Sequence, residues 1–135
     1  MKNLLLIFTC FALLSTSCKK DKDDPVITYS PGFGGNGEIS AYVRYNDNLE
    51  AGARIYIKYG VDSFPTADTT LFDSLKVCGS TGHGLGHSHI KPLHKGKYYL
   101  YAVSYDSTLA QYIYGDAAVK LESEDDHEEI TITLE

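Results

Sequence analysis

The sequence predicts an all-β protein, a seven-stranded antiparallel sandwich that follows a signal peptide and a flexible tether. Three observations lead to this prediction. From residue 38 onward, apolar and polar side chains alternate with a period of two, and β-branched and aromatic residues dominate the alternating segments. Clusters of Gly, Asn, Asp and Pro separate these segments. No stretch shows the 3.6-residue period of an amphipathic helix.

The first 17 residues have the pattern of a secretory signal peptide. Lys2 supplies a positive charge, an apolar run of 11 residues covers positions 4–14, and three small residues follow at 15–17. As a helix, the run would span about 16 Å, which is too short for a hydrocarbon core of about 30 Å. We therefore expect a cleaved signal and not a permanent anchor.

Cys18 directly follows these small residues, and the arrangement resembles the lipobox of bacterial lipoproteins, although Ser15 stands where that motif usually has leucine. The resemblance implies cleavage before Cys18 and acylation of its sulfur and its new amino group with chains such as palmitate. Two or three chains attach a protein stably to a membrane. We expect a lipid-anchored protein of the cell outer membrane, on its periplasmic or surface face. The alternative is an ordinary secretory signal followed by a chance cysteine.

Residues 18–36 form the expected tether. The charged run at 19–25 (KKDKDDP) cannot bury apolar surface, and glycines occupy positions 32, 34, 35 and 37. Acidic residues soon after the cysteine also resemble an export signal of some Gram-negative lipoproteins, with a plain solubilising linker as the alternative. The mature chain has 11 basic and 18 acidic residues, a net charge of −7, which argues against nucleic-acid binding. Cys78 is left without a partner for an intramolecular disulfide.

The remaining residues, 37–135, form the expected sandwich domain. In its first strand, Ile39, Ala41 and Val43 fall on one face. Residues 97–106 are largely apolar or aromatic on both faces, which is typical of a central strand covered on both sides. The expected strands cover residues 38–45, 53–59, 71–78, 87–93, 97–106, 111–122 and 128–134.

Two segments resemble the carboxypeptidase regulatory-like domain, a transthyretin-like sandwich of broadly immunoglobulin-like architecture. AGARIY at 51–56 is similar to that family's "adding-a-value" segment, and LHKGKYYL at 93–100 to its L-x-x-G-x-Y-x-L stretch. CGSTG at 78–82 stands where a T-D-x-x-G turn is usual, without the aspartate. The resemblance covers about residues 37–134. It implies a non-catalytic module in which Tyr98, Leu100 and Ala102 face the core.

Four of the five histidines fall close together, at His83, His87, His89 and His94. In an extended segment, His87 and His89 project to the same side with Cα atoms about 6.6 Å apart. Two imidazoles at this spacing can converge on a zinc or copper ion, with His83 or His94 as a third ligand. The alternative is a set of polar side chains on a solvated, glycine-rich turn. We expect no other cofactor. We also expect no enzyme activity, because neither a nucleophile elbow nor a phosphate-binding loop is present.

Tyrosine is abundant, with 11 residues and no tryptophan. Outward rings can stack on sugars or anchor a protein partner. The expected strand phases place six tyrosines outward or across a strand edge: Tyr42, Tyr56, Tyr99, Tyr101, Tyr112 and Tyr114. The last four are the candidate binding residues. Ordinary cross-strand tyrosine pairing is the alternative. Our first hypothesis is a non-catalytic, lipid-anchored structural or protein-interaction module of the envelope. The alternatives are a metal-binding lipoprotein that uses the 83–94 loop and a glycan-binding surface lipoprotein that uses exposed tyrosines.

Overall fold

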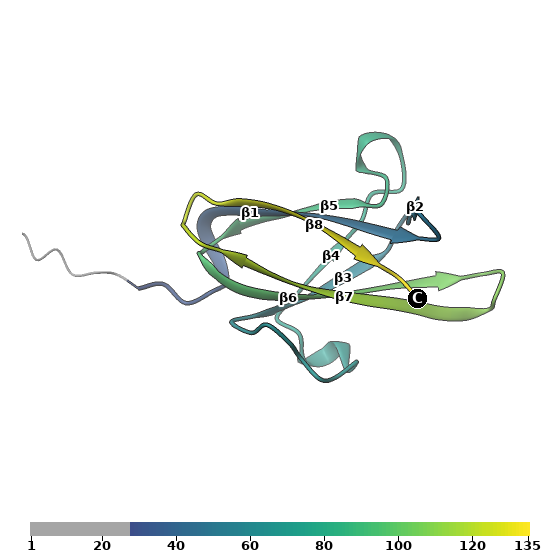
Figure 1. Cartoon of the computed structure of the whole chain (residues 1–135), viewed down its shortest axis with the longest axis horizontal. Coiled ribbons are helices and arrows are strands. Elements are labelled where there is room, and N and C mark those ends of the chain that lie inside the picture. The colour runs from purple at the N-terminus through teal and green to yellow at the C-terminus, as the bar shows by residue number, and fades with distance from the viewer. Residues whose placement is uncertain (1–27) are drawn as a thin grey trace, which may run out of the picture.

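The computed structural model describes residues 28–135. The expected signal peptide (1–17), Cys18 and the tether up to residue 27 lie outside the described residues. Residues 28–135 form an all-β fold of two four-stranded sheets that lie face to face (Figure 1). No helix in this part of the chain is both long enough and apolar enough to cross a membrane.

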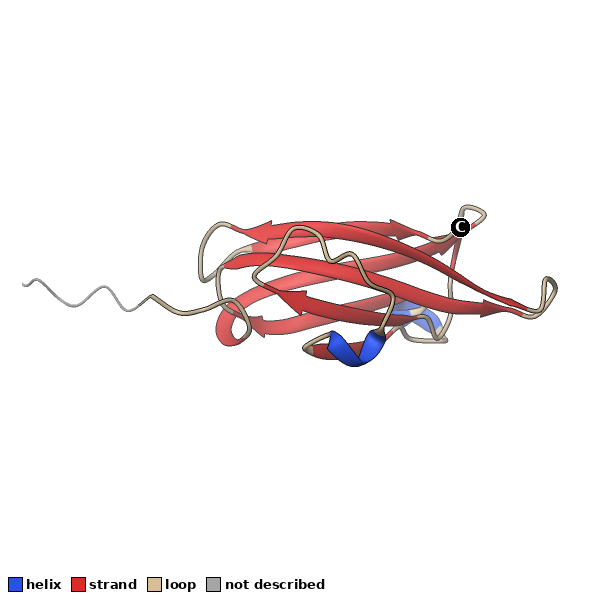
Figure 2. Ribbon diagram, turned by 90° about the horizontal axis from the view of Figure 1, so that it is seen from below, coloured by secondary structure: helices blue, strands red, loops and turns tan. Residues whose placement is uncertain are grey.

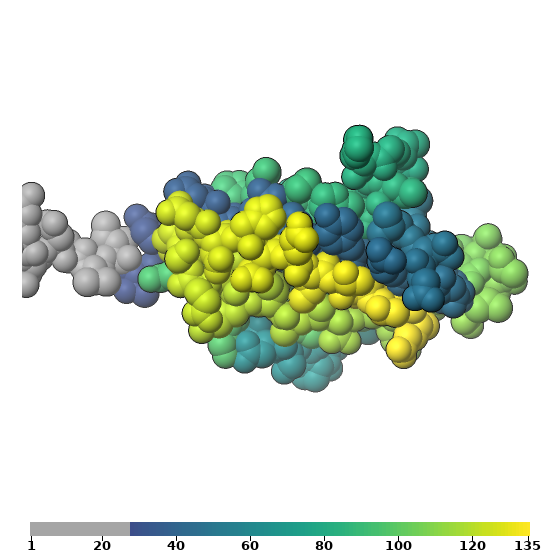
Figure 3. All heavy atoms as spheres, turned by 45° about the horizontal axis from the view of Figure 1, so that its top comes forward, coloured from purple at the N-terminus to yellow at the C-terminus, as the bar shows by residue number. Residues whose placement is uncertain are grey.

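The first sheet is built around β1 (Phe33–Tyr45), the longest strand. It pairs with β5 (His87–Leu93) and, near its C-terminal end, with the two-residue β2 (Asn48–Leu49), both antiparallel. On the other side of β1 lies β8 (His127–Thr133). Figure 3 shows β8 and β1 side by side on the outer face of this sheet, with the loop before β5 standing off the surface.

The pairing of β1 with β8 is parallel, so the prediction of a purely antiparallel sandwich is wrong at this place. The chain leaves β7 in one sheet, turns at residues 122–126 and joins the other sheet beside β1. Alternation specifies which face of a strand is apolar, but it carries no information on the direction of the neighbouring strand.

The second sheet has the order β4 (Ser74–Val77), β3 (Arg54–Tyr59), β6 (Gly96–Asp106) and β7 (Gln111–Leu121). All its pairs are antiparallel. The strand β6 pairs on both sides, which confirms the central position expected from its sequence. Each expected strand overlaps one of the observed strands, and β2 is the addition.

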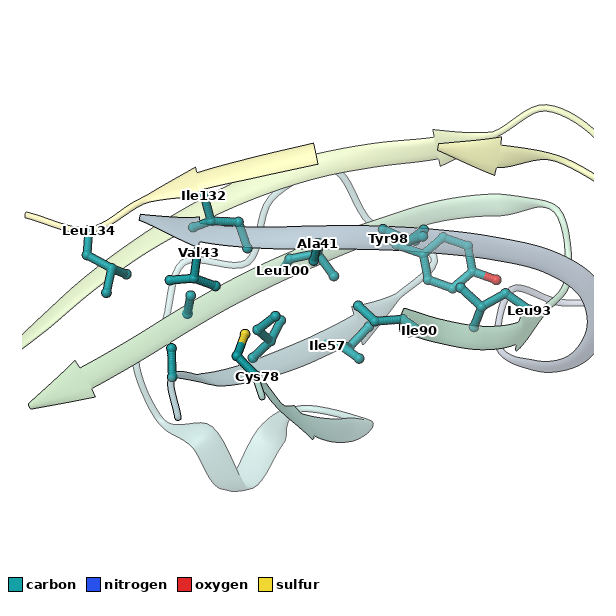
Figure 4. Packing of buried hydrophobic residues seen from close by; sticks show 14 of the residues in the cluster. Ala41, Val43, Ile57, Cys78, Ile90, Leu93, Tyr98, Leu100, Ile132 and Leu134 are labelled. Carbon is teal, nitrogen blue, oxygen red and sulfur yellow. The ribbon is translucent and has the colours of Figure 1, made fainter. Parts of the chain in front are cut away.

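The core lies between the sheets. Ile39, Ala41 and Val43 of β1 are fully buried. Figure 4 shows Ala41 and Val43 pointing toward the apolar side chains of the opposite sheet. Tyr98, Leu100 and Ala102 are also fully buried, which confirms the inward face implied by the family resemblance. Because successive residues of a strand point to opposite faces, Tyr99, Tyr101, Val103 and Tyr105 are left on the outer face of the second sheet.

The sheets are also joined at one side, where β7 and β8 approach closely. The Glu135 N–H donates to Tyr114 O at 3.0 Å, and the Tyr114 N–H donates to Glu135 O at 3.3 Å. Gly115 permits the approach, because a Cβ atom there would lie 2.0 Å from Thr133 O. Side chains larger than hydrogen do not fit at this crossing.

The folded region begins before the expected tether ends. Residues 33–36 belong to β1, five residues ahead of the predicted strand start. Just before them, Gly32 N–H donates to the Tyr98 hydroxyl at 3.0 Å, and the His94 N–H donates to Gly32 O at 2.9 Å. The Tyr29 ring stacks on His94 with ring centroids 4.3 Å apart. The end of the predicted tether is therefore packed onto the sandwich.

Two segments outside the strands matter for the surface. The connection from β3 to β4 contains a short 3-10 helix, η1 (Thr69–Leu71), and lies against the outer face of the second sheet (Figure 2). A second 3-10 helix, η2 (Gly82–Gly84), lies in the loop before β5. The β6–β7 hairpin extends at the end of the molecule opposite to residue 28 (Figure 1).

Candidate functional site

The outer face of the second sheet carries a cleft of about 590 Å³ beside the β6–β7 hairpin. We call it the tyrosine cleft. Four tyrosines line it, from three adjacent strands: Tyr56 of β3, Tyr101 and Tyr105 of β6, and Tyr112 of β7. Polar side chains complete the lining, together with small residues of the flanking loops. These polar side chains are Glu50, Arg54, Thr69 and Ser104.

The register of the sheet brings the tyrosines together. Tyr56 is paired with Tyr101 across β3 and β6, and Tyr105 is paired with Tyr112 across β6 and β7. The rings of the second pair meet edge to face, with centroids 5.2 Å apart and planes at 68°. Directly opposite residues of an antiparallel pair have neighbouring side chains, so this contact follows from the hairpin register.

Asp106 fixes the hairpin turn that holds this pair. Its carboxylate accepts the N–H of Thr108 at 2.7 Å and of Leu109 at 3.1 Å. The bond from Leu109 and the further bonds to the carboxylate lower the pKa of Asp106. Ala110 adopts a left-handed conformation with φ of 53° before β7 begins. The turn therefore sets the register in which Tyr105 faces Tyr112.

The expectation that Tyr99 is an exposed binding residue is wrong. Phe72, from the β3–β4 connection, stacks over it with ring centroids 6.4 Å apart, and only 9% of Tyr99 is exposed. Burial raises the pKa of the Tyr99 hydroxyl. Phe64 packs edge to face on Phe72, and Asp68 caps the adjacent η1 by accepting the Thr70 N–H. The connection therefore covers one part of the tyrosine-rich face and leaves the cleft beside it open.

The other predicted tyrosines are placed differently. Tyr112 is 69% exposed and Tyr114 is 57% exposed, which confirms that both point outward. Tyr101 is half-buried beside Phe72 but still lines the cleft. Tyr114 lies outside the tyrosine cleft and lines a groove between β7 and β8 instead.

Tyr105 and the polar residues of the cleft are not among the residues predicted from the sequence. Tyr105 has the same strand phase as Tyr101, so the alternation contained the signal for it. Ser104 and Glu50 gave no such signal, because they meet only in the folded chain. There the Ser104 hydroxyl donates to Glu50 Oε1 at 2.6 Å.

The histidines predicted as metal ligands are only partly brought together. His87 and His89 share the outer face of the first sheet, with ring centroids 4.3 Å apart, as their spacing predicted. His83 lies exposed in η2. His94 lies beyond the far end of β5, about 16 Å from His89 at the usual rise of a strand, and its ring contacts Glu124 at 2.8 Å. The four side chains do not meet.

Instead, His127 joins His89 around a buried serine that the sequence gave no reason to select. The Ser40 hydroxyl lies 3.2 Å from His89 Nδ1 and 3.2 Å from His127 Nε2. Glu38 contacts His89 and accepts a bond from Lys91 at 2.9 Å. The hydrogen bond from Lys91, followed by the contact with His89, lowers the pKa of Glu38 to about 2. These side chains form a charged network on the sheet surface.

Among residues 28–135, no group of three or more His, Cys, Asp and Glu side chains is arranged to hold a metal ion. Cys78 lies in the core, 3% exposed, and burial raises the pKa of its thiol to about 11. In the described part of the chain, the tyrosine cleft is therefore the candidate binding feature and not a metal site.

A comparison with protein-family models finds none that matches this chain. A comparison with curated proteins finds no match either.

Proposed function

We propose that the protein is a non-catalytic, lipid-anchored protein of the cell envelope that binds a carbohydrate chain in the tyrosine cleft. The observation that carries this proposal is the combination of four tyrosine rings with charged and hydroxyl side chains in one cleft of about 590 Å³. Ligand sites typically measure about 300–1,000 Å³ and combine apolar walls with a few placed polar groups. Sugars present apolar C–H faces to aromatic rings and hydroxyl groups to hydrogen-bonding partners.

The lining favours a carbohydrate over a large protein partner. Thr69 of the β3–β4 connection and Tyr112 of the hairpin both line the cleft, and the hydrogen-bonded pair of Glu50 and Ser104 is also part of its lining. A protein interface of standard size buries about 800 Å² on each partner and is usually flatter. A hydroxyl-rich chain fits a narrow, polar and aromatic cleft better.

We also propose how the domain is attached to the membrane and oriented on it. Acylation of Cys18 anchors the chain, residues 19–27 act as the tether, and the sandwich is of the transthyretin-like type. The described chain starts at one end of the molecule, and the cleft lies toward the hairpin at the other end (Figure 1). This placement supports a role in which the cleft faces away from the membrane.

Affinity electrophoresis tests the binding function. The mature protein in detergent is run through native gels that contain neutral or acidic polysaccharides, and we expect retardation by at least one of them. Tyr112→Ala weakens the retardation about two- to tenfold, the range expected for one aromatic contact. Tyr29→Ala is the matched control, because this ring is also exposed, at 47%, but lies against His94 and outside the cleft. Unchanged mobility across the panel contradicts the proposal.

Intact-mass analysis of the protein extracted from membranes tests the anchor. The expected mass is that of residues 18–135 with two or three acyl chains on Cys18. A mature N-terminus at any other residue, or a mass without acyl chains, contradicts this part of the proposal.

A further inference from the structure

Arg54 occupies an unusual position in the tyrosine cleft. It is one of only two arginines in the chain, and its side chain is exposed on the outer face of the second sheet. Among residues 28–135, the ion pairs formed by basic side chains involve only lysines and histidines. The guanidinium of Arg54 therefore has no ion-pair partner within 4 Å in this part of the chain, and it lines the cleft together with the tyrosines and the carboxylate of Glu50.

The surrounding residues explain why Arg54 has no acidic partner. Its cross-strand neighbours are Val77 on β4 and Val103 on β6, both aliphatic. The acidic side chain that lines the same cleft, Glu50, accepts the hydrogen bond from Ser104 at 2.6 Å. The sheet thus presents the five N–H donors of a guanidinium to whatever enters the cleft.

We propose that the carbohydrate bound in the tyrosine cleft is acidic, and that Arg54 binds a carboxylate of its uronic acid units. This inference rests on the proposed function and specifies its ligand class. A guanidinium matches a carboxylate through two parallel hydrogen bonds, while the neighbouring rings supply surfaces for the sugar faces. Tyr56 and Tyr101 lie two register positions along from Arg54 and Val103, as the next pair on the same face of the sheet. A sugar ring and its carboxylate can therefore reach both contacts at once.

The negative charge of the whole chain restricts binding at Arg54 to anionic ligands that also stack on the tyrosines. A net charge of −7 for the mature chain repels polyanions at long range. Beyond about 8 Å, physiological salt screens this repulsion, so binding depends on what the ligand meets within the cleft. A flexible anionic polymer without sugar rings gains the Arg54 contact but no stacking on the tyrosines.

The test compares two forms of one polysaccharide. Polygalacturonate and its fully methyl-esterified form share a backbone and differ in the charge of the carboxyl groups. We expect the mature protein to bind the free acid about tenfold more tightly in affinity gels, which is the usual contribution of a charge-assisted hydrogen-bonded pair. Arg54→Gln removes this preference, and Arg54→Lys restores part of it, because the charge returns without the planar fork.

Arg44→Gln is the matched control. It removes the other arginine, which lies on the first sheet and donates to Asp47 O at 3.1 Å. This variant loses the same charge as Arg54→Gln but leaves the cleft intact, so the preference for the free acid persists. Thermal unfolding of each variant, followed by circular dichroism, shows that the fold is unchanged.

The outcomes separate this inference from the function on which it rests. Equal binding of the free acid and the methyl ester, with no effect of Arg54→Gln, overturns the acidic ligand and leaves carbohydrate binding standing. Equal retardation by polyglutamate overturns the carbohydrate in favour of an acidic peptide. Binding to none of the polysaccharides overturns both proposals.

Discussion

Replacing Tyr98 with phenylalanine tests how the start of the folded region is held to the sandwich. The side chain is fully buried, and its hydroxyl accepts the Gly32 N–H at 3.0 Å and donates to His94 O. It is therefore the point at which the end of the predicted tether joins β6. Tyr98→Phe keeps the ring and its packing and removes only the hydroxyl, with these two bonds and its longer contact to Gly32 O at 3.4 Å.

The expected loss of stability comes from the Gly32 N–H and the His94 carbonyl, which both lose their partner. A buried N–H without a partner costs about 1–3 kcal/mol, and the lost bond to His94 adds about 0.5–1.5 kcal/mol. We expect the free energy of unfolding to fall by about 2–3 kcal/mol. With a urea dependence of about 1–3 kcal/mol per molar, the midpoint of unfolding falls by about 1–2 M.

Equilibrium urea unfolding, followed by circular dichroism, measures this loss. Tyr112→Phe is the control, because its ring is 69% exposed and the substitution keeps the contact of that ring with Tyr105. That variant should change the free energy of unfolding by less than about 0.5 kcal/mol. Equal effects of the two substitutions would refute the reasoning, and residues 28–32 would then contribute nothing to stability.

Three further predictions concern other parts of the molecule. Gly115→Ala places a methyl group against Thr133 O and should lower the thermal unfolding midpoint in calorimetry by several degrees. Gly84→Ala, where the added Cβ would meet only Gly79 Cα at 3.6 Å, should cost less than Gly115→Ala. The pKa of Glu38 is about 2 in the fold, against an ordinary value of 4.5. Its contribution to stability is therefore complete above pH 4.5 and is lost as the pH falls toward 2. In Glu38→Gln, the free energy of unfolding, measured by urea titration at each pH, should depend less on pH over that window. Because burial raises the pKa of Cys78 to about 11, iodoacetamide at pH 7.5 should label it only in urea.

Much of the local structure could be predicted from the sequence. The alternation along each segment gave the strands, because a strand with one buried face needs apolar residues at every second position. It also gave the outward direction of Tyr112 and Tyr114 and the shared side of His87 and His89. Each of these features depends on neighbours in the chain, which the sequence displays directly.

The features that only the tertiary structure decided all join segments far apart in the chain. Phe72 covers Tyr99 from a loop that has no periodicity, and His127 reaches Ser40 because β8 runs parallel to β1. The Glu50–Ser104 bond closes over 54 residues.

Alternation assigns each side chain to a face of its own strand, but the choice and direction of the partner strand depend on how the two apolar faces pack together. For that reason the sequence by itself determined which residues point outward. The strand register of the second sheet, with the β3–β4 connection on its outer face, decided which of those residues meet to form the cleft.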